Sequence, residues 1–129
     1  MKKNNVIYWI STLIVSLMML FSAYLYLTSD EVKAAFVHLG FPSYFRVELA
    51  IAKLLGAIIL LVPAVPIRLK EFAYFGFAVT FISAFIAHTS SGDPGKIAAG
   101  PLIFLAVLIV SFIYFLKLNT VSPKQLAHQ

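Results

Sequence analysis

The sequence contains no cysteine and little charge, and these two absences limit what the protein can be. Without cysteine the chain has no disulfide, no thiolate ligand for a metal or iron–sulfur cluster, and no thiol nucleophile. Only 12% of its residues are Asp, Glu, Lys or Arg, against about a quarter in an average soluble domain. The sequence also lacks a glycine-rich phosphate-binding loop and any Ser/His/Asp arrangement in a recognisable setting, so it offers no motif for the enzymes built on them.

The few charges sum to +5, from ten Lys and Arg and five Asp and Glu. The basic residues are scattered along the chain rather than gathered on one face, and most of them flank apolar runs. This distribution is typical of membrane topology signals. A nucleic-acid-binding surface needs a clustered basic patch, so we expect no nucleic acid partner.

What the sequence has in excess is apolar surface, because 61% of its residues are hydrophobic. A fold of 129 residues leaves a large share of its chain exposed, so this surplus cannot be hidden from water. The solvent around most of the chain is therefore a lipid bilayer, and the length allows a single domain. The first apolar run follows a basic start, as in a signal peptide, but at about 20 residues it predicts an uncleaved membrane helix.

Four apolar runs are long enough to cross the hydrocarbon core as helices, which takes about 20 residues, with a lower limit near 17. They cover residues 6–27, 45–62, 72–88 and 97–116. Lipid admits only helices or closed barrels, because backbone polar groups must pair internally. The runs are continuous, whereas barrel strands alternate. The predicted fold is all-α: one integral membrane four-helix bundle formed by residues 1–129.

The connections between these spans are short and carry recognisable signals. After the first span, TSDE predicts a capping box with Thr28 as N-cap and Glu31 three residues later. A short interfacial helix, DEVKAAFVHL, is expected to follow and to end at Gly40. In SSGDPG, before the last span, Asp93 is the expected N-cap and Pro94 the first helical residue.

The basic residues also predict an orientation. One side of the four spans carries Lys2, Lys3, Arg68, Lys70, Lys117 and Lys124, and the other carries Lys33, Arg46 and Lys96. The positive-inside rule then places both termini in the cytoplasm of a multi-pass protein, which we expect in the plasma membrane. The polar segment from Asn119 onward is expected to be a disordered cytoplasmic tail.

The second span, RVELAIAKLLGAIILLVP, contains two ionisable residues, Glu48 and Lys53, which are costly in lipid. With Glu48 at 0° on a wheel of about 100° per residue, Ala52 falls near 40°, Gly56 near 80° and Lys53 near 140°. Small residues mark the faces where membrane helices approach closely. We therefore expect the charged arc and the packing face to coincide and to point into the bundle.

The third span offers a matching surface of small residues that ends in a histidine. Chain direction brings the outer ends of spans two and three together, so Glu48 and His88 are expected at similar depth, with Lys53 roughly 7–8 Å deeper. The candidates for a polar pocket or ligand site are Glu48, Lys53, Ser83 and His88. The candidates for helix packing are Ala52, Gly56, Gly76 and Thr80.

Two interpretations of the pocket candidates are open. In one, they form a pocket or short proton relay that opens outward, with Glu48 and His88 titrating. In the other, Glu48 and Lys53 pair with each other or with neighbours and fix helix register, and His88 interacts with the helix dipole. No residue is assigned as catalytic and no metal is expected, since a membrane b-type haem usually needs two facing histidines and only His88 lies on a span.

Four sequence elements together resemble the DoxX-like family of small four-helix membrane proteins: GFP-Y-F, K-LG, KE-AY-GF and AH---GD. They occur in HLGFPSYFRVELAIAKLLGAIILLVP and RLKEFAYFGFAVTFISAFIAHTSSGD, and with SFIYF in the last span the resemblance covers roughly residues 36–116. It implies a compact four-helix bundle. The positions that match the family pattern are Lys53, Gly56, Lys70, Glu71, Tyr74, Gly76, His88, Gly92 and Asp93.

The resemblance also implies a function class. The family takes its name from a membrane subunit of a thiosulfate:quinone oxidoreductase, so the first expectation is a non-catalytic subunit or a component that binds a quinone- or lipid-like molecule in a membrane redox or stress-response assembly. Without cysteine or an evident redox-metal site, at most an accessory role in such an enzyme is expected. The alternative is a structural or chaperone-like membrane partner with no ligand. A small proton-coupled carrier comes third, because no inverted repeat or broken helix supports it. The expected partners are the bilayer and a membrane protein or second copy, and quinone is the one candidate cofactor.

Overall fold

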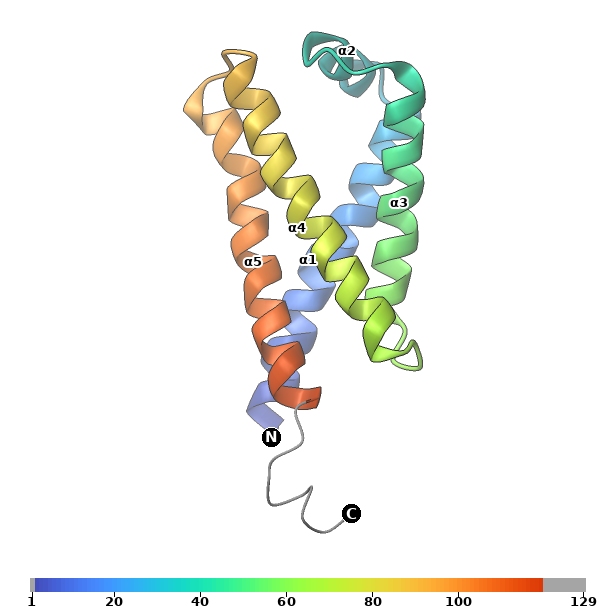
Figure 1. Cartoon of the computed structure of the whole chain (residues 1–129), viewed down its shortest axis with the longest axis vertical. Helices are drawn as coiled ribbons and strands as arrows, with labels where there is room; N and C mark the ends of the chain where they lie inside the picture. Colours follow the sequence, from blue (N-terminus) through green and yellow to red (C-terminus); the bar gives the residue numbers. More distant parts are fainter. Residues whose placement is uncertain (1, 120–129) are drawn as a thin grey trace.

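The computed structural model describes residues 2–119, and these form five helices and no strand (Figure 1). The helices are α1 (Lys2–Thr28), α2 (Asp30–His38), α3 (Ser43–Leu61), α4 (Ile67–Ser90) and α5 (Gly95–Asn119). Each predicted span coincides with one of the four long helices, and the short helix expected after the first span is α2. The all-α prediction is confirmed. The predicted tail lies outside the described residues, apart from Asn119, which ends α5.

Three of the long helices, α1, α4 and α5, are long and apolar enough to cross a membrane. The fourth, α3, has 19 residues and carries three ionisable side chains, those of Arg46, Glu48 and Lys53. Its three charged side chains, which lie within its apolar run, set it apart from those three helices, although it packs extensively on α1. The chain thus has three to four candidate spans, as a multi-pass membrane protein requires.

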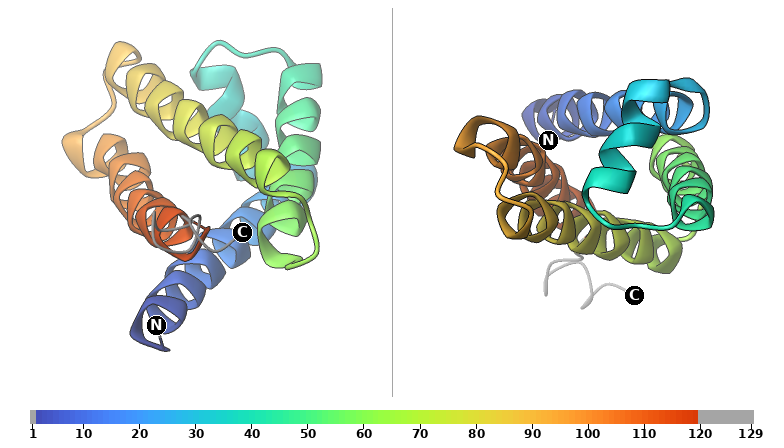
Figure 2. Two further views of the ribbon diagram at one scale, coloured as in Figure 1. Left: turned by 60° about the horizontal axis from the view of Figure 1, so that its bottom comes forward. Right: turned by 90° about the horizontal axis from the view of Figure 1, so that it is seen from above.

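The long helices form a ring in which α1 packs on α3 and α5, and α4 packs on α5 and less extensively on α3. The start of α1, the end of α5 and the α3–α4 turn share one end of the bundle, and α2 and the α4–α5 turn share the other (Figure 1). We call these the terminal end and the α2 end. In Figure 1, α4 crosses α3 near the terminal end and diverges from it toward α2. Seen from above in Figure 2, α2 lies across the opening between the long helices.

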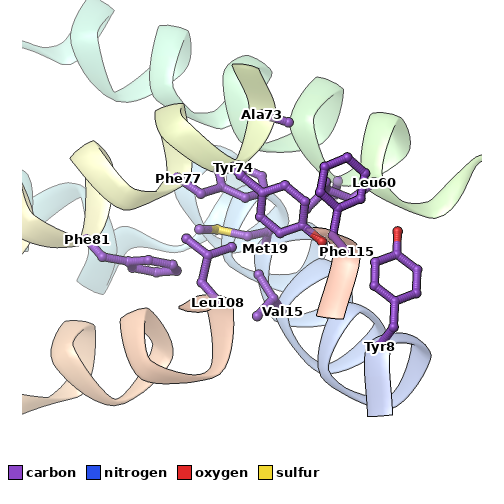
Figure 3. Close-up of a cluster of buried hydrophobic side chains, with 11 residues drawn as sticks. Tyr8, Val15, Met19, Leu60, Ala73, Tyr74, Phe77, Phe81, Leu108 and Phe115 are labelled. Atoms are coloured by element: carbon purple, nitrogen blue, oxygen red, sulfur yellow. The ribbon is translucent and has the colours of Figure 1, made fainter. Parts of the chain in front are cut away.

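The buried apolar core draws on all four long helices and lies mostly in the half of the bundle nearer the terminal end. Figure 3 shows its side chains converging between the helices; the largest of them are the aromatic ones of Tyr8, Tyr74, Phe77, Phe81 and Phe115. In lipid no hydrophobic force distinguishes these contacts from contacts with acyl chains, so close van der Waals packing holds the helices together. Because this core fills the terminal half, the α2 half is less densely packed.

A chain of buried hydroxyl groups crosses the same core. Ser111 on α5 lies 2.6 Å from the Thr12 hydroxyl on α1 and 2.6 Å from the Tyr74 hydroxyl on α4. All three side chains are buried, and each bond satisfies a polar group that lipid cannot satisfy. Interhelical hydrogen bonds of this kind are worth about 0.6 kcal/mol on average and up to about 1.7 in membrane proteins. This network of three hydroxyl groups therefore fixes the rotation of α1, α4 and α5 relative to one another.

The start of α2 differs by one residue from the prediction. Its N-cap is Ser29, whose hydroxyl accepts the Val32 N–H at 3.3 Å. Thr28 instead ends α1, and its hydroxyl donates to the Tyr24 carbonyl. The predicted capping box with Thr28 is therefore wrong, because α1 continues through that residue. The predicted stop of α2 is confirmed, since Gly40 follows it with φ of 84°, which favours glycine.

Candidate functional site

A cavity of about 520 Å³ lies in the α2 half of the bundle and is lined by residues from all five helices. Its volume falls in the range of roughly 300–1,000 Å³ that is usual for small-molecule sites. Most of the lining is apolar. The polar or aromatic-hydroxyl groups in its wall belong to Tyr26, Lys53, Thr80, Ser83 and His88. An apolar cavity with a few convergent polar groups is suited to an amphiphilic ligand.

Lys53 is the charged group in this wall, and it is 6% exposed. Its Nζ donates to the Ser22 hydroxyl at 2.8 Å and lies 3.8 Å from the centre of the Tyr26 ring. Both partners are on α1, so the contact ties α3 to α1. Within residues 2–119, Lys53 forms no ion pair. A buried cation normally pairs with an anionic group. Among the described residues Lys53 has no such partner, so its charge could be paired by a ligand.

Glu48 is exposed and does not line the cavity, so the prediction that it points into the bundle beside Lys53 is wrong. The buried residues of α3 are Ala50, Lys53, Gly56, Ala57 and Leu60. With Glu48 at 0°, they span about 80° to 200° on the helical wheel, with Lys53 near the middle at about 140°. The inward face is thus centred near Lys53 rather than between the two charges, because the packing of α3 on its neighbours decides how the helix is rotated. Glu48 then lies outside that face.

His88 lines the cavity, and its hydrogen-bond partner is Asp93. The Asp93 carboxylate holds two histidines: Oδ2 lies 2.7 Å from Nδ1 of His88, and Oδ1 lies 2.8 Å from Nε2 of His38 on α2. Hydrogen bonds from His88 and then from His38 lower the pKa of Asp93 below its ordinary value. We call this arrangement the Asp93 bridge. It connects α2 to the α4–α5 turn beside the cavity.

The same contacts overturn the prediction that Asp93 is the N-cap of the last span. Helix α5 begins at Gly95, and Pro94 precedes it. Gly92 has φ of 77°, and the Asp93 N–H donates to the His88 carbonyl at 3.0 Å. The turn therefore folds back onto the end of α4, which directs the Asp93 side chain to the two histidines.

Ser83 and Thr80 lie on the α4 wall of the cavity. The Thr80 hydroxyl donates to the Gly76 carbonyl at 2.8 Å, so it is partly occupied by its own helix. Three of the four sequence-derived pocket candidates, Lys53, Ser83 and His88, thus line one cavity. Glu48 is the exception.

A second, smaller hollow of about 340 Å³ lies in the groove between α3 and α4. Ala52 and Gly76 line it and are exposed, so the structure places them on the walls of a groove rather than in the expected close helix contact. The close contact is at Gly56, where an added Cβ would lie 2.5 Å from Cζ of Phe77. Helices α3 and α4 diverge toward α2 (Figure 1). Lys53 lines both the groove and the cavity, as do Leu49 and Thr80.

Other positions of the family pattern have structural roles. Lys70 is buried, and its Nζ donates to the Leu60 carbonyl at 3.2 Å. That carbonyl is in the last turn of α3, where helix carbonyls lack internal partners and attract cations. Tyr74 belongs to the hydroxyl chain of the core, and Glu71 is exposed. Lys70 and Tyr74 thus serve the fold at a distance from the cavity.

Sequence reasoning did not identify Ser22 or His38 as site residues. Ser22 precedes Tyr26 by four residues, so both lie on one face of α1, and this spacing could have identified the pair. His38 and Asp93 are 55 positions apart. No local pattern indicates that contact, since it depends on how α2 is folded over the bundle.

The model of the DoxX-like family matches residues 10–111, which is most of the chain. The chain belongs to the DoxX-like family. The matched range contains the whole lining of the cavity and all three residues of the Asp93 bridge. Neither a curated protein nor a solved structure matches this DoxX-like protein.

Proposed function

We propose that this DoxX-like protein is a non-catalytic membrane component that binds a quinone- or lipid-like molecule in the cavity beside α2. The observation that carries the proposal is Lys53, a buried ammonium without an ion pair in the described part of the chain, in the wall of a largely apolar cavity. An apolar tail would contact the aromatic and aliphatic lining, and a polar head would accept hydrogen bonds from Nζ. We place this component in a membrane redox or stress-response assembly, as its family suggests.

The groove between α3 and α4 supports a ligand that comes from the bilayer. It faces outward from the ring of helices and shares three lining residues with the cavity, among them Lys53. A molecule dissolved in the bilayer would enter the groove and then pass only these three side chains to reach the cavity. It would not have to pass α2.

The proposed setting is the plasma membrane, with both termini in the cytoplasm and α2 on the opposite side. The excess of Lys and Arg at the terminal end supports this orientation. Because the chain has no cysteine, single cysteines can report it cleanly. Intact cells treated with a membrane-impermeant maleimide should label Lys33→Cys on α2 and leave Ala64→Cys in the α3–α4 turn unlabelled. The reverse pattern would refute the orientation.

The alternative function is a structural or chaperone-like partner without a ligand. It is favoured by the two contacts that Lys53 already has on α1, the Ser22 hydroxyl and the Tyr26 ring. In that case the charge only fixes how α3 packs against α1, and substitution of Lys53 should change stability or assembly alone.

Native mass spectrometry of protein extracted in its own lipids separates the two functions. We expect the wild type to carry a stoichiometric molecule other than bulk lipid, and Lys53→Met to lose it. Glu48→Gln is the matched control, because it removes a charge five positions away on the exposed face of α3. Retention of the molecule by a folded Lys53→Met protein, or bulk lipid alone on the wild type, would leave the structural alternative.

A further inference from the structure

We infer that the cavity binds a single-chain amphiphile with an anionic head, in which the head pairs with Lys53 and the chain fills the apolar space toward α2. The inference rests on the proposed function and narrows the class of its ligand. It concerns the charge of the head, which a quinone lacks.

The first observation is the balance of charge around the cavity. Its lining contains Lys53 and His88 but no Asp or Glu from the described part of the chain. Glu48 is exposed on the other side of α3. Asp93 is held by two histidines and is not in the lining. The cavity is therefore positive at Lys53, and complementary charge favours an anion.

The second observation is the number of hydrogen bonds that the ammonium has left. A lysine head has three N–H donors, and the Ser22 hydroxyl accepts one of them. The Tyr26 ring faces the charge without accepting a conventional hydrogen bond. A carboxylate or phosphate can accept the remaining donors and neutralise the charge, whereas a neutral carbonyl leaves a buried cation uncompensated.

The third observation is that the cavity extends from Lys53 toward α2. Lys53 lies ten residues after the start of α3, at roughly 15 Å along its axis from the α2 end. The lining nearer α2 is mostly apolar, with Val32, Phe36 and Leu39 from α2 and the segment after it, and His88 is at its edge in the Asp93 bridge. A chain anchored at Lys53 therefore runs from the middle of the span toward α2. That orientation is opposite to the lipids of the same leaflet, whose heads lie at the surface. The volume of about 520 Å³ is in the lower half of the usual range, which suits one chain rather than two.

A pair of probes with the same chain tests the inference on the whole protein in neutral detergent. We expect the wild type to bind oleate at least about tenfold more tightly than oleyl alcohol, because a hydrogen bond to a charged group contributes that much. Lys53→Met should weaken oleate binding about tenfold or more and leave oleyl alcohol within about twofold, and Lys53→Arg should retain the preference. Dodecyl phosphate against dodecanol distinguishes a phosphate head from a carboxylate.

Three outcomes overturn the inference. Equal binding of oleate and oleyl alcohol by the wild type would show that the head charge is not recognised, and this comparison does not depend on any variant folding. Tight binding of a short-chain ubiquinone, sensitive to Lys53→Met, would keep the proposed function and exclude the anion. No binding of any probe, together with no co-purified molecule, would remove both. Photo-crosslinking by a fatty acid with a diazirine at its methyl end should label α2 peptides, and labelling only near the terminal end would contradict the orientation.

Discussion

The ammonium nitrogen of Lys53 on α3 lies 3.8 Å from the centre of the Tyr26 ring on α1. This contact explains how the second span holds a charge that has no ion pair among the described residues. The ring face is the negative end of its quadrupole, and the attraction is worth about 2 kcal/mol or more where both groups are desolvated. The same contact holds the Lys53 ammonium in the cavity wall. It therefore stabilises the buried charge and also leaves it accessible to a ligand in the cavity.

Removal of the Tyr26 ring should therefore destabilise the packing of α3 on α1. We expect Tyr26→Leu to lower the free energy of unfolding by about 1–2 kcal/mol, and Tyr26→Phe to stay within about 0.5 kcal/mol of the wild type. Tyr26 also packs edge-on against Phe36, so the charge-dependent part needs a double-mutant cycle with Lys53→Met. Denaturant unfolding in detergent provides the measurement. If Tyr26→Leu lowers the free energy of unfolding as much in the Lys53→Met background as in the wild type, the ring does not act through the Lys53 cation.

Gly56 should be the most size-sensitive glycine of the bundle. An added Cβ would lie 2.5 Å from Cζ and 2.7 Å from Cε1 of Phe77, so Gly56→Ala should cost about 1–3 kcal/mol of stability. Gly76→Ala is the control, because nothing lies within 4 Å of its added Cβ and alanine favours a helix by about 0.5–1 kcal/mol. The double variant Gly56→Ala/Phe77→Leu should recover part of the loss. Equal stability of the two alanine variants would contradict the close contact of α3 and α4.

Ser111 should be the most costly hydroxyl to remove. It is the shared hydrogen-bond partner of Thr12 and Tyr74, and all three side chains are buried. Ser111→Ala leaves both partners without this bond, so we expect a loss of about 1–2 kcal/mol in unfolding free energy. Thr89→Ala is the control, since its exposed hydroxyl donates only to carbonyls of its own helix. Less than additive losses in Thr12→Val/Ser111→Ala would support one connected network, and full additivity would argue against it.

The Asp93 bridge should open in acid. The hydrogen bonds from His88 and His38 lower the pKa of Asp93 in the folded protein, so the unbridged state binds the proton first. The bridge is then fully present above the ordinary Asp pKa of about 3.9 and is lost as the pH falls through the lower folded value. The protection of α2 amides from hydrogen exchange can be measured in nanodiscs. From about pH 7 to pH 5, the titration of Asp93 should not change this protection. At pH values below about 4, the protection should decrease.

Asp93→Asn should reduce the protection of α2 at neutral pH and abolish its change in acid. Asp30→Asn is a suitable control, because Asp30 is exposed and, within the described part of the chain, its only ion pair is with Lys33 on the same helix at 3.8 Å. If Asp93→Asn keeps the acid transition, another group controls how α2 is held over the cavity.

The sequence alone determined the number, class and approximate bounds of the long helices, the short helix after the first of them and its stop at Gly40. Each follows from the length of apolar runs and from local backbone preferences, which need no information about neighbours. The family followed in the same way from local motifs, and the match over residues 10–111 confirms it. Lys53 and His88 could likewise be singled out, because ionisable residues in apolar runs are conspicuous.

Which of these residues share a site depends on how the helices pack against one another. A helical wheel gives the angles between residues but not the rotation of the helix, and the contact of α3 with α1 turned Lys53 inward and left Glu48 outside. The Asp93 bridge joins two residues that are 55 positions apart, so it exists only once α2 is folded across the bundle. Composition and periodicity reflect residues that are close in sequence, whereas packing between helices determines the partner of each polar group. Here the partners are Ser22 and Tyr26 for Lys53 and Asp93 for His88.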